Sequence, residues 1–170
     1  MKRILSFLAL ALATSLSAGS PASAQANPAP AAFQQLKSLA GRWQGTDEHG
    51  RNVRSTFVLI AGNTAVMETL YPPEMEPMVT LYSLDGNAIA LMHYCPTNNQ
   101  PHMRAIPPAG AVKQLVFQFQ GAGNLPTLAT GHEYKLVMDF QDANRIVERW
   151  TWRENGKDSD MIYHLRRQPQ

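Results

Sequence analysis

The amino-acid sequence predicts an all-β protein, a single antiparallel up-and-down β-barrel of about ten strands with a short N-terminal helix. Strand-like runs follow one another at short, regular intervals from residue 41 onward, with no second helical pattern. Turn residues join most of these runs through hairpin-length connections. Closing such a meander into a barrel leaves no strand edge unpaired, whereas a β-sandwich, the structural alternative, keeps its edges.

The first 24 residues predict a cleaved export signal. Lys2 and Arg3 precede an apolar run at residues 4–16, and Ala22-Ser23-Ala24 forms a small-residue cleavage site. The apolar run is too short to span a bilayer comfortably, and no second such run follows it. We therefore expect cleavage after Ala24 and a soluble periplasmic or secreted protein without membrane insertion.

The remaining chain divides into a leader and one domain. Residues 25–32 are rich in proline and alanine and predict a disordered leader, while residues 33–170 form the barrel domain. Phe33, Leu36 and Leu39 recur at helical spacing and predict one or two helical turns. Alternating apolar and polar residues, separated by turn residues, then predict strands at 42–46, 53–60, 65–70, 79–84, 88–95, 101–106, 113–120, 133–140, 145–153 and 160–167.

Composition excludes two classes of partner. The 15 lysines and arginines fall to 13 without Lys2 and Arg3, and they then match the 13 aspartates and glutamates. No basic run with interleaved aromatic residues is present, which excludes the charge pattern of a nucleic-acid binder. No basic amphipathic helix indicates a membrane surface. Cys95 is the only cysteine, so an internal disulfide cannot form, and the oligomeric state stays open.

Residues 39–43, Leu-Ala-Gly-Arg-Trp, resemble the start of a calycin, the superfamily of lipocalins and fatty-acid-binding proteins. Calycins open with a short helical turn and a Gly-x-Trp motif, which Gly41 and Trp43 match. They commonly place an arginine from the last strand across this tryptophan; Arg167 is the best match and Arg166 a close rival. The resemblance implies that Gly41, Trp43 and Arg167 close one end of the barrel, which is a structural role.

The middle of the chain, with an Asp-Gly turn followed by His-Tyr-Cys and Asn-Gln-Pro, resembles secreted bacterial calycin-like proteins of unassigned function. This resemblance covers most of the mature chain and implies a fold without an activity. A haem-binding branch of such barrels opens with Gly-x-Trp-x-Gly-x-Gly and a later Tyr-Pro pattern, whereas residues 41–47 read GRWQGTD. We therefore expect no cofactor.

A short segment in the middle of the chain holds its only cysteine and two of its five histidines. A four-residue hairpin loop at residues 96–99 would place Cys95 opposite Gln100 and His93 opposite His102, with Cβ atoms about 5 Å apart. His93 and Cys95 would share the inner face, because side chains two apart on a strand point the same way. The hypothesis is a polar rim at one mouth of the barrel, and a register shift of one residue would dissolve it.

Three interpretations of this cluster stay open. In the first, the histidines bond to loop carbonyls and Cys95 is a small buried hydrophobic residue. In the second, the cluster orients a ligand. In the third, a histidine activates the Cys95 thiolate for catalysis. One lipocalin, an isomerase, provides a precedent for a catalytic cysteine inside the barrel. We expect no metal site, because adjacent His102 and Met103 point to opposite faces and no zinc-ligand spacing accompanies His93.

Two further residues are candidates for the cavity. Glu68 alternates with Val66 and Leu70, so it is either a buried carboxyl with a raised pKa or a member of an ion pair. Trp150 shares a face with Trp152, which is typical of a core or a pocket wall. With His93, Cys95, Gln100 and His102, they make up the predicted ligand-binding set.

The predicted function is the binding of a small apolar or amphipathic molecule in the barrel cavity. One alternative is a small thiol- or histidine-dependent isomerase, cyclase or hydrolase, and another is an envelope protein-interaction module that uses residues 71–77 and 121–131. The cavity distinguishes them. A filled interior excludes ligand binding and leaves the interaction module. An open cavity with His93 and Cys95 in hydrogen-bond reach favours the enzyme, and an open cavity without this pair favours passive binding.

Overall fold

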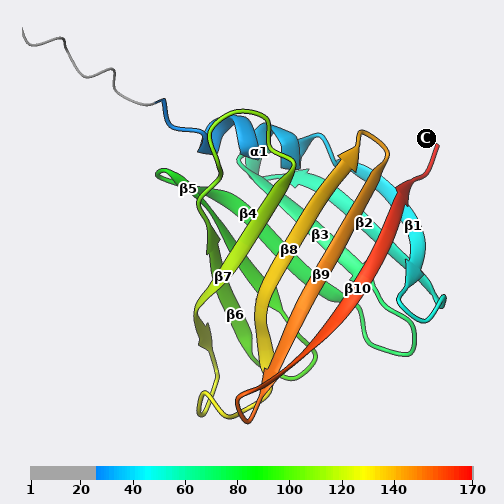
Figure 1. The fold of residues 1–170 in the computed structure, drawn as a ribbon, viewed down its shortest axis with the longest axis vertical. Coiled ribbons are helices and arrows are strands. Elements are labelled where there is room, and N and C mark those ends of the chain that lie inside the picture. Colours follow the sequence, from blue (N-terminus) through cyan, green and yellow to red (C-terminus); the bar gives the residue numbers. More distant parts are fainter. Residues whose placement is uncertain (1–25, 170) are drawn as a thin grey trace, which may run out of the picture.

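The computed structural model describes residues 26–169; the predicted export signal and the first residue of the predicted leader lie outside this range. Ten antiparallel strands form one closed barrel, which confirms the predicted fold class (Figure 1). The strands follow one another round the barrel in chain order, and β1 closes the ring by pairing with β10. The elements are α1 (Ala29–Lys37), β1 (Gly41–Asp47), β2 (Asn52–Ile60), β3 (Ala65–Tyr71), β4 (Met78–Asp85), β5 (Ala88–Tyr94), β6 (Gln100–Ala105), β7 (Gln114–Gly123), β8 (His132–Asp142), β9 (Arg145–Glu154) and β10 (Lys157–Arg167).

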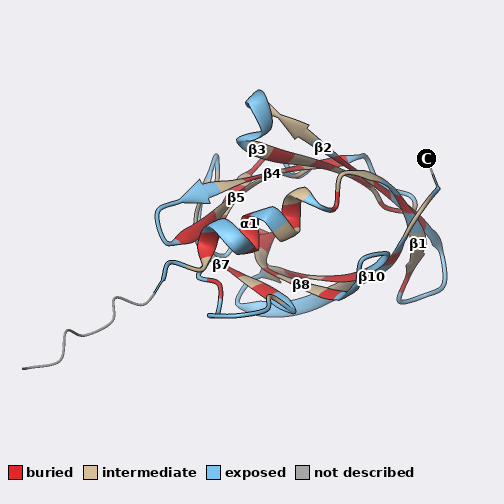
Figure 2. Cartoon of the chain, turned by 90° about the horizontal axis from the view of Figure 1, so that it is seen from above, coloured by how far each residue is buried: buried red, intermediate tan, exposed pale blue. Residues whose placement is uncertain are grey.

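Helix α1 lies across one end of the barrel, as the view from above shows (Figure 2). It buries Ala29, Ala32, Phe33 and Leu36, which share one face at helical spacing. The helix begins four residues before Phe33, so it takes in part of the stretch that sequence analysis assigned to the leader. The Asn27 side chain accepts a hydrogen bond from the Ala29 amide at 3.0 Å, which stabilises this early start.

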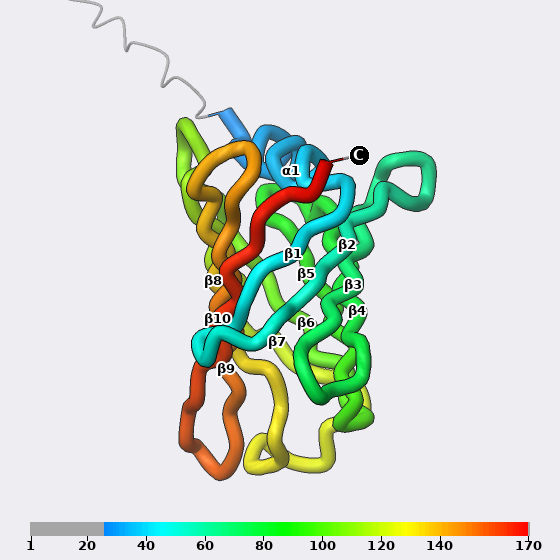
Figure 3. The backbone as a smooth tube through the Cα atoms, turned by 90° about the vertical axis from the view of Figure 1, so that its right-hand side faces the viewer, coloured from blue at the N-terminus to red at the C-terminus, as the bar shows by residue number. Residues whose placement is uncertain are grey.

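The opposite end of the barrel carries loops instead of a helix (Figure 3). Because strand direction alternates, this end collects the connections at residues 48–51, 72–77, 95–99, 124–131 and 155–156. We call it the open end. Within residues 26–169, no helix has the length and apolar character needed to cross a membrane.

Aromatic side chains from different strands meet inside the barrel. The ring centroid of Trp150 on β9 lies 4.6 Å from that of His93 on β5, and that of Tyr82 on β4 lies 5.6 Å from that of Phe117 on β7. All four side chains are buried. These contacts occupy the part of the interior between β4, β5, β7 and β9.

A tryptophan and an arginine pack against each other at the helix end. The guanidinium of Arg167 lies 4.4 Å from the ring centroid of Trp43, whose indole donates a hydrogen bond to the Leu39 carbonyl at 2.8 Å. Arg167 also donates to the Ala40 carbonyl at 2.9 Å and the Ser38 carbonyl at 2.7 Å. These bonds satisfy carbonyls that follow the end of α1, so one side chain joins the helix, the first strand and the last strand.

Gly41 and Arg166 lie next to this contact between Arg167 and Trp43. Gly41 has a φ of 132°, in a region that favours glycine, and a Cβ there would lie 3.3 Å from a guanidinium nitrogen of Arg167. Arg166 is exposed on the other face of β10. Arg167, and not Arg166, is therefore the arginine across Trp43.

Candidate functional site

The β5–β6 hairpin is one residue tighter than predicted. The Asn98 amide donates to the Cys95 carbonyl at 3.2 Å, and Met92 lies opposite His102. The loop therefore has three residues instead of four, and the prediction that His93 lies opposite His102 is wrong. Asn98 adopts a left-handed conformation, with a φ of 67°, which asparagine tolerates well and which closes a three-residue hairpin loop.

The register shift turns two predicted site residues outward. The His102 ring packs over Gly121, where a Cβ would lie 2.8 Å from it, and Gln100 leaves the inner face with His102. Asn99 is buried in their place, and its side-chain amide donates to the Gly131 carbonyl at 2.9 Å. The structure thus does not bring His93, Cys95, Gln100 and His102 together at one rim.

His93 points into the barrel interior. Its Nδ1 lies 2.9 Å from the Thr80 hydroxyl oxygen, and its ring packs against Trp150. Burial lowers the pKa of His93 to about 4, because a buried imidazolium loses its hydration. Nε2 has no hydrogen-bond partner among the described residues. His93 is therefore an uncharged side chain that packs inside the barrel against Trp150.

Two buried carboxyl groups lie in the same interior. Glu68 accepts hydrogen bonds from Ser55 at 2.7 Å and from Tyr82 at 2.8 Å, and Glu148 accepts one from the Trp150 indole at 3.2 Å. Burial raises the pKa of both carboxyls, and the proximity of Glu68 raises that of Glu148 further. Neither forms an ion pair within residues 26–169. Glu68 is thus a buried acid held by hydroxyl donors.

An apolar pocket of about 270 Å³ opens at the loop-bearing end of the barrel. Trp152 forms part of its wall and packs on Gly131, where an added methyl group would overlap the indole ring. The pocket is lined by Met75, Met78, Cys95, Pro96, Thr97, Glu133, Trp152, Ser159 and Met161. Of the predicted ligand-binding set, only Cys95 is in this lining.

Glu133 is the carboxyl group in this lining. It is 2% exposed, and its Oε2 has no hydrogen-bond partner in the part of the chain that the structure describes. Burial raises the pKa of Glu133 to about 8, so most molecules carry the protonated acid at neutral pH. An unsatisfied buried acid at a pocket wall is a common mark of a binding or catalytic site.

Sequence analysis missed Glu133 because β8 contains a β-bulge. Glu133 pairs with Trp152 and Lys135 pairs with Thr151, so Tyr134 has no opposite residue. Simple alternation from Leu136 back along the strand places Glu133 on the outer face. No glycine or proline at this point indicates the extra residue, so the sequence holds no signal that would have found it.

The Cys95 thiol has no histidine partner in the part of the chain that the structure describes. Its sulfur accepts a hydrogen bond from Thr97 at 3.1 Å, and no hydrogen bond joins it to a histidine within the described residues. Cys95 is half-buried in the pocket wall, whereas His93 is not in the lining. In residues 26–169, no three His, Cys, Asp or Glu side chains gather in a way that could hold a metal ion.

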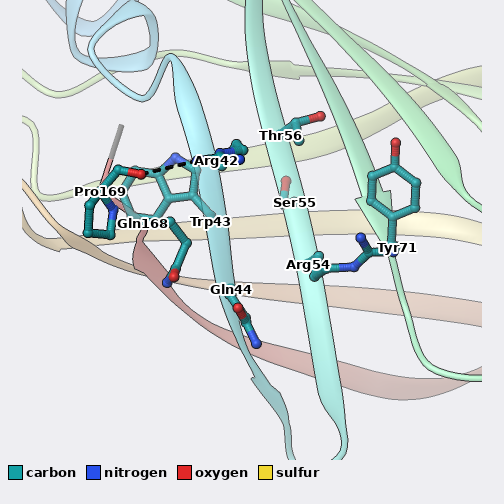
Figure 4. A pocket seen from close by; sticks show the side chains of 9 residues that line it. All are labelled: Arg42, Trp43, Gln44, Arg54, Ser55, Thr56, Tyr71, Gln168 and Pro169. Carbon is teal, nitrogen blue, oxygen red and sulfur yellow. Dashed lines mark hydrogen bonds between the residues drawn. The ribbon is translucent and has the colours of Figure 1, made fainter.

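A second hollow, of about 420 Å³, lies on the outer wall near the start of β1 and β2 (Figure 4). The guanidinium of Arg54 lies 5.0 Å from the Tyr71 ring, and Arg42 donates to the Pro169 carbonyl at 3.3 Å. Both arginines are exposed to solvent, where ionic contacts are weak. This polar groove contains none of the predicted ligand-binding residues, and the open-end pocket is the better candidate site.

Comparisons with known proteins support the fold. No family model and no curated protein matches the chain. The structure is similar to the crystal structure of Rv2717c from M. tuberculosis, with a TM-score of 0.59 and 14% sequence identity. The match covers 81% of this chain and 98% of that chain. At this identity the likeness shows a shared fold alone.

Proposed function

We propose that this protein is an exported, calycin-like barrel that binds a small, largely apolar molecule in the pocket at its open end. One observation carries the proposal: an apolar pocket of about 270 Å³ has a single buried carboxyl group, that of Glu133, in its lining. Ligand sites are typically concave and apolar, with a few polar groups that orient the ligand. The calycin assignment draws support from the closed barrel and from the contact between Trp43 and Arg167.

The arrangement of Cys95 favours binding over thiol catalysis. Cys95 lines the pocket, but His93 lies outside the lining and bonds with Thr80 instead. A catalytic thiolate needs a nearby base or positive charge to lower its pKa. The structure therefore supports passive binding, with Cys95 as a wall residue.

The position of the pocket gives the ligand its place. Its lining includes residues of the loops at the open end, so the proposed ligand binds at the mouth of the barrel. Methionine side chains line this mouth, and their flexible thioethers adapt to ligands of different shapes. The ligand is expected to place its apolar part against the methionines and a polar group beside Glu133.

The test is a fluorescence titration of the mature chain with N-phenyl-1-naphthylamine, an uncharged apolar dye that brightens in apolar sites. Ser159→Phe places a ring at the pocket, and His164→Phe places the same ring on the outer face of the same strand. Both positions are exposed, so neither change disturbs the core. We expect saturable dye binding to the native protein and His164→Phe, and weaker binding to Ser159→Phe. Equal binding by all three proteins would contradict the proposed site.

A further inference from the structure

The walls of the open-end pocket carry an acidic group and no basic one. Among the described residues, its lining contains no lysine, arginine or histidine. Glu133 and Trp152 are direct neighbours in it, because their Cα atoms are paired across β8 and β9. A carboxyl group and an aromatic ring together suit an ammonium group, since the first provides charge and the second its π face.

Further carboxyl groups surround this part of the barrel. Burial raises the pKa of Tyr163, and so do the nearby carboxyls of Glu133, Glu148, Glu48 and Asp47. The Tyr163 hydroxyl lies 3.8 Å from the sulfur of a methionine that lines the pocket. The pocket therefore adjoins a cluster of acidic side chains, which can stabilise a cation placed among them.

A smaller hollow of about 40 Å³ continues the pocket toward β1. It shares Met75 and Met161 with the larger pocket, and Asp47 and Glu48 are in its lining. Its one guanidinium, that of Arg51, is already paired with Asp47 at 2.7 Å and also bonds to a second acid. Acidic side chains thus extend along the rim, and the arginine among them is already paired.

We propose that the pocket binds a hydrophobic amine as its ammonium ion, with Glu133 as the counter-ion and Trp152 as the aromatic wall. The inference rests on the proposed function and names the class of ligand. A lone buried acid destabilises a fold relative to an apolar residue of similar size, and an ammonium group placed beside it removes that penalty. The hydrocarbon part of the amine lies against the methionine side chains.

A matched pair of probes tests the ligand class. 4-Phenylbutylamine and 4-phenylbutan-1-ol share a ring and a chain, and differ in having a charged or a neutral end. By calorimetric titration of the mature chain at pH 7, we expect the amine to bind about tenfold or more tightly than the alcohol. Glu133→Gln is expected to abolish this preference. Glu154→Gln, which removes an exposed carboxyl at the same end, is expected to keep it.

Proton release gives a second readout of the same pairing. Because the free carboxyl of Glu133 is mostly protonated at pH 7, ammonium binding expels about one proton, which appears as a dependence of the binding enthalpy on the buffer. The other titratable groups that face this region are Tyr163, Glu148, Cys95, Arg51 and the rim acids Asp47 and Glu48. Loss of proton release in Glu133→Gln assigns the proton to Glu133 and not to these neighbours.

The outcomes separate the inference from the proposed function. Equal or tighter binding of the alcohol, or a preference for the amine that survives Glu133→Gln, overturns the inference and leaves the proposed pocket standing. Failure of both probes and of the naphthylamine dye to bind contradicts the proposed function itself. The comparison of the two probes on the native protein decides the ligand class even where the substitution weakens dye binding.

Discussion

Replacing Glu133 with glutamine is expected to stabilise the protein, and increasingly so as pH rises. Glutamine keeps the size of the side chain and removes its ionisable group. Between pH 4.5 and 8 the folded state holds the Glu133 proton, while the unfolded chain, with its usual glutamate pKa, has lost it. Folding therefore takes up a proton in this range, and the free energy of unfolding of the native sequence falls as pH rises.

The magnitude follows from the two pKa values. A pKa of about 8 in the folded state against the usual 4.5 makes each pH unit between them cost about 1.4 kcal/mol. At pH 7 the accumulated cost is roughly 3 kcal/mol, and above pH 8 it levels off near 5 kcal/mol. These costs are comparable with the total stability of a small domain, so the change is within easy reach of measurement.

Urea unfolding at pH 5, 6, 7 and 8, followed by tryptophan fluorescence, measures the effect. The quantity of interest is the difference in the free energy of unfolding between Glu133→Gln and the native protein, because contributions from Glu68 and Glu148 cancel in it. We expect this difference to grow by about 1 kcal/mol or more per pH unit, while Glu154→Gln shows no such trend. Parallel curves for the native protein and Glu133→Gln would refute the argument that Glu133 is buried and unpaired.

Three further predictions concern other parts of the molecule. Arg167→Ala removes several hydrogen bonds and the stack on Trp43, so we expect it to lower the free energy of unfolding in urea by about 2–4 kcal/mol. The control Arg166→Ala should lower it by less than about 0.5 kcal/mol. Equal losses in the two variants would exclude a closing role for Arg167. Because burial holds the pKa of His93 near 4 instead of 6.5, protonation of His93 contributes a loss of roughly 3 kcal/mol between pH 6.5 and 4, opposite in sign to the gain from Glu133. The free energy of unfolding of His93→Asn relative to the native protein should rise by about this amount as pH falls over the range, because the carboxyl contributions cancel in the difference; a constant difference would contradict it. Cys95 should react with a thiol reagent in the folded protein, and saturating naphthylamine dye should slow this reaction, as followed by mass spectrometry. The same rate of reaction with and without the dye would show that the dye binds elsewhere.

The fold follows from patterns that extend over many residues. Alternation along β2 and β9 predicted residues 53–60 and 145–153, within one residue of the observed strand ends. The contact between Trp43 and Arg167 joins the two ends of the barrel domain, and a resemblance to a family of barrels was enough to anticipate it. A strand can be predicted from its alternating pattern even when one residue departs from the pattern, because each strand contributes several residues to the same face.

The candidate site depends on two single-residue irregularities. A loop one residue shorter than expected turned His102 outward and buried Asn99, and a bulge at Tyr134 turned Glu133 inward. The period of a strand is two residues, so one inserted or missing residue reverses every face beyond it. Loop length and bulge position depend on backbone conformations such as the positive φ of Asn98, which asparagine permits but does not require.

The three buried glutamates among the described residues show why burial alone does not identify a site. Glu68 accepts hydrogen bonds from two hydroxyl groups, and Glu148 accepts one from an indole. Both oxygens of Glu68 have partners, whereas Oε1 of Glu148 has none in the part of the chain that the structure describes. Glu133 differs from both because its side chain lines a pocket, where its unpartnered Oε2 lies beside open space. An acid with an unfilled bonding position beside an open space has a place for a ligand atom, and that combination distinguishes a binding group from a structural one.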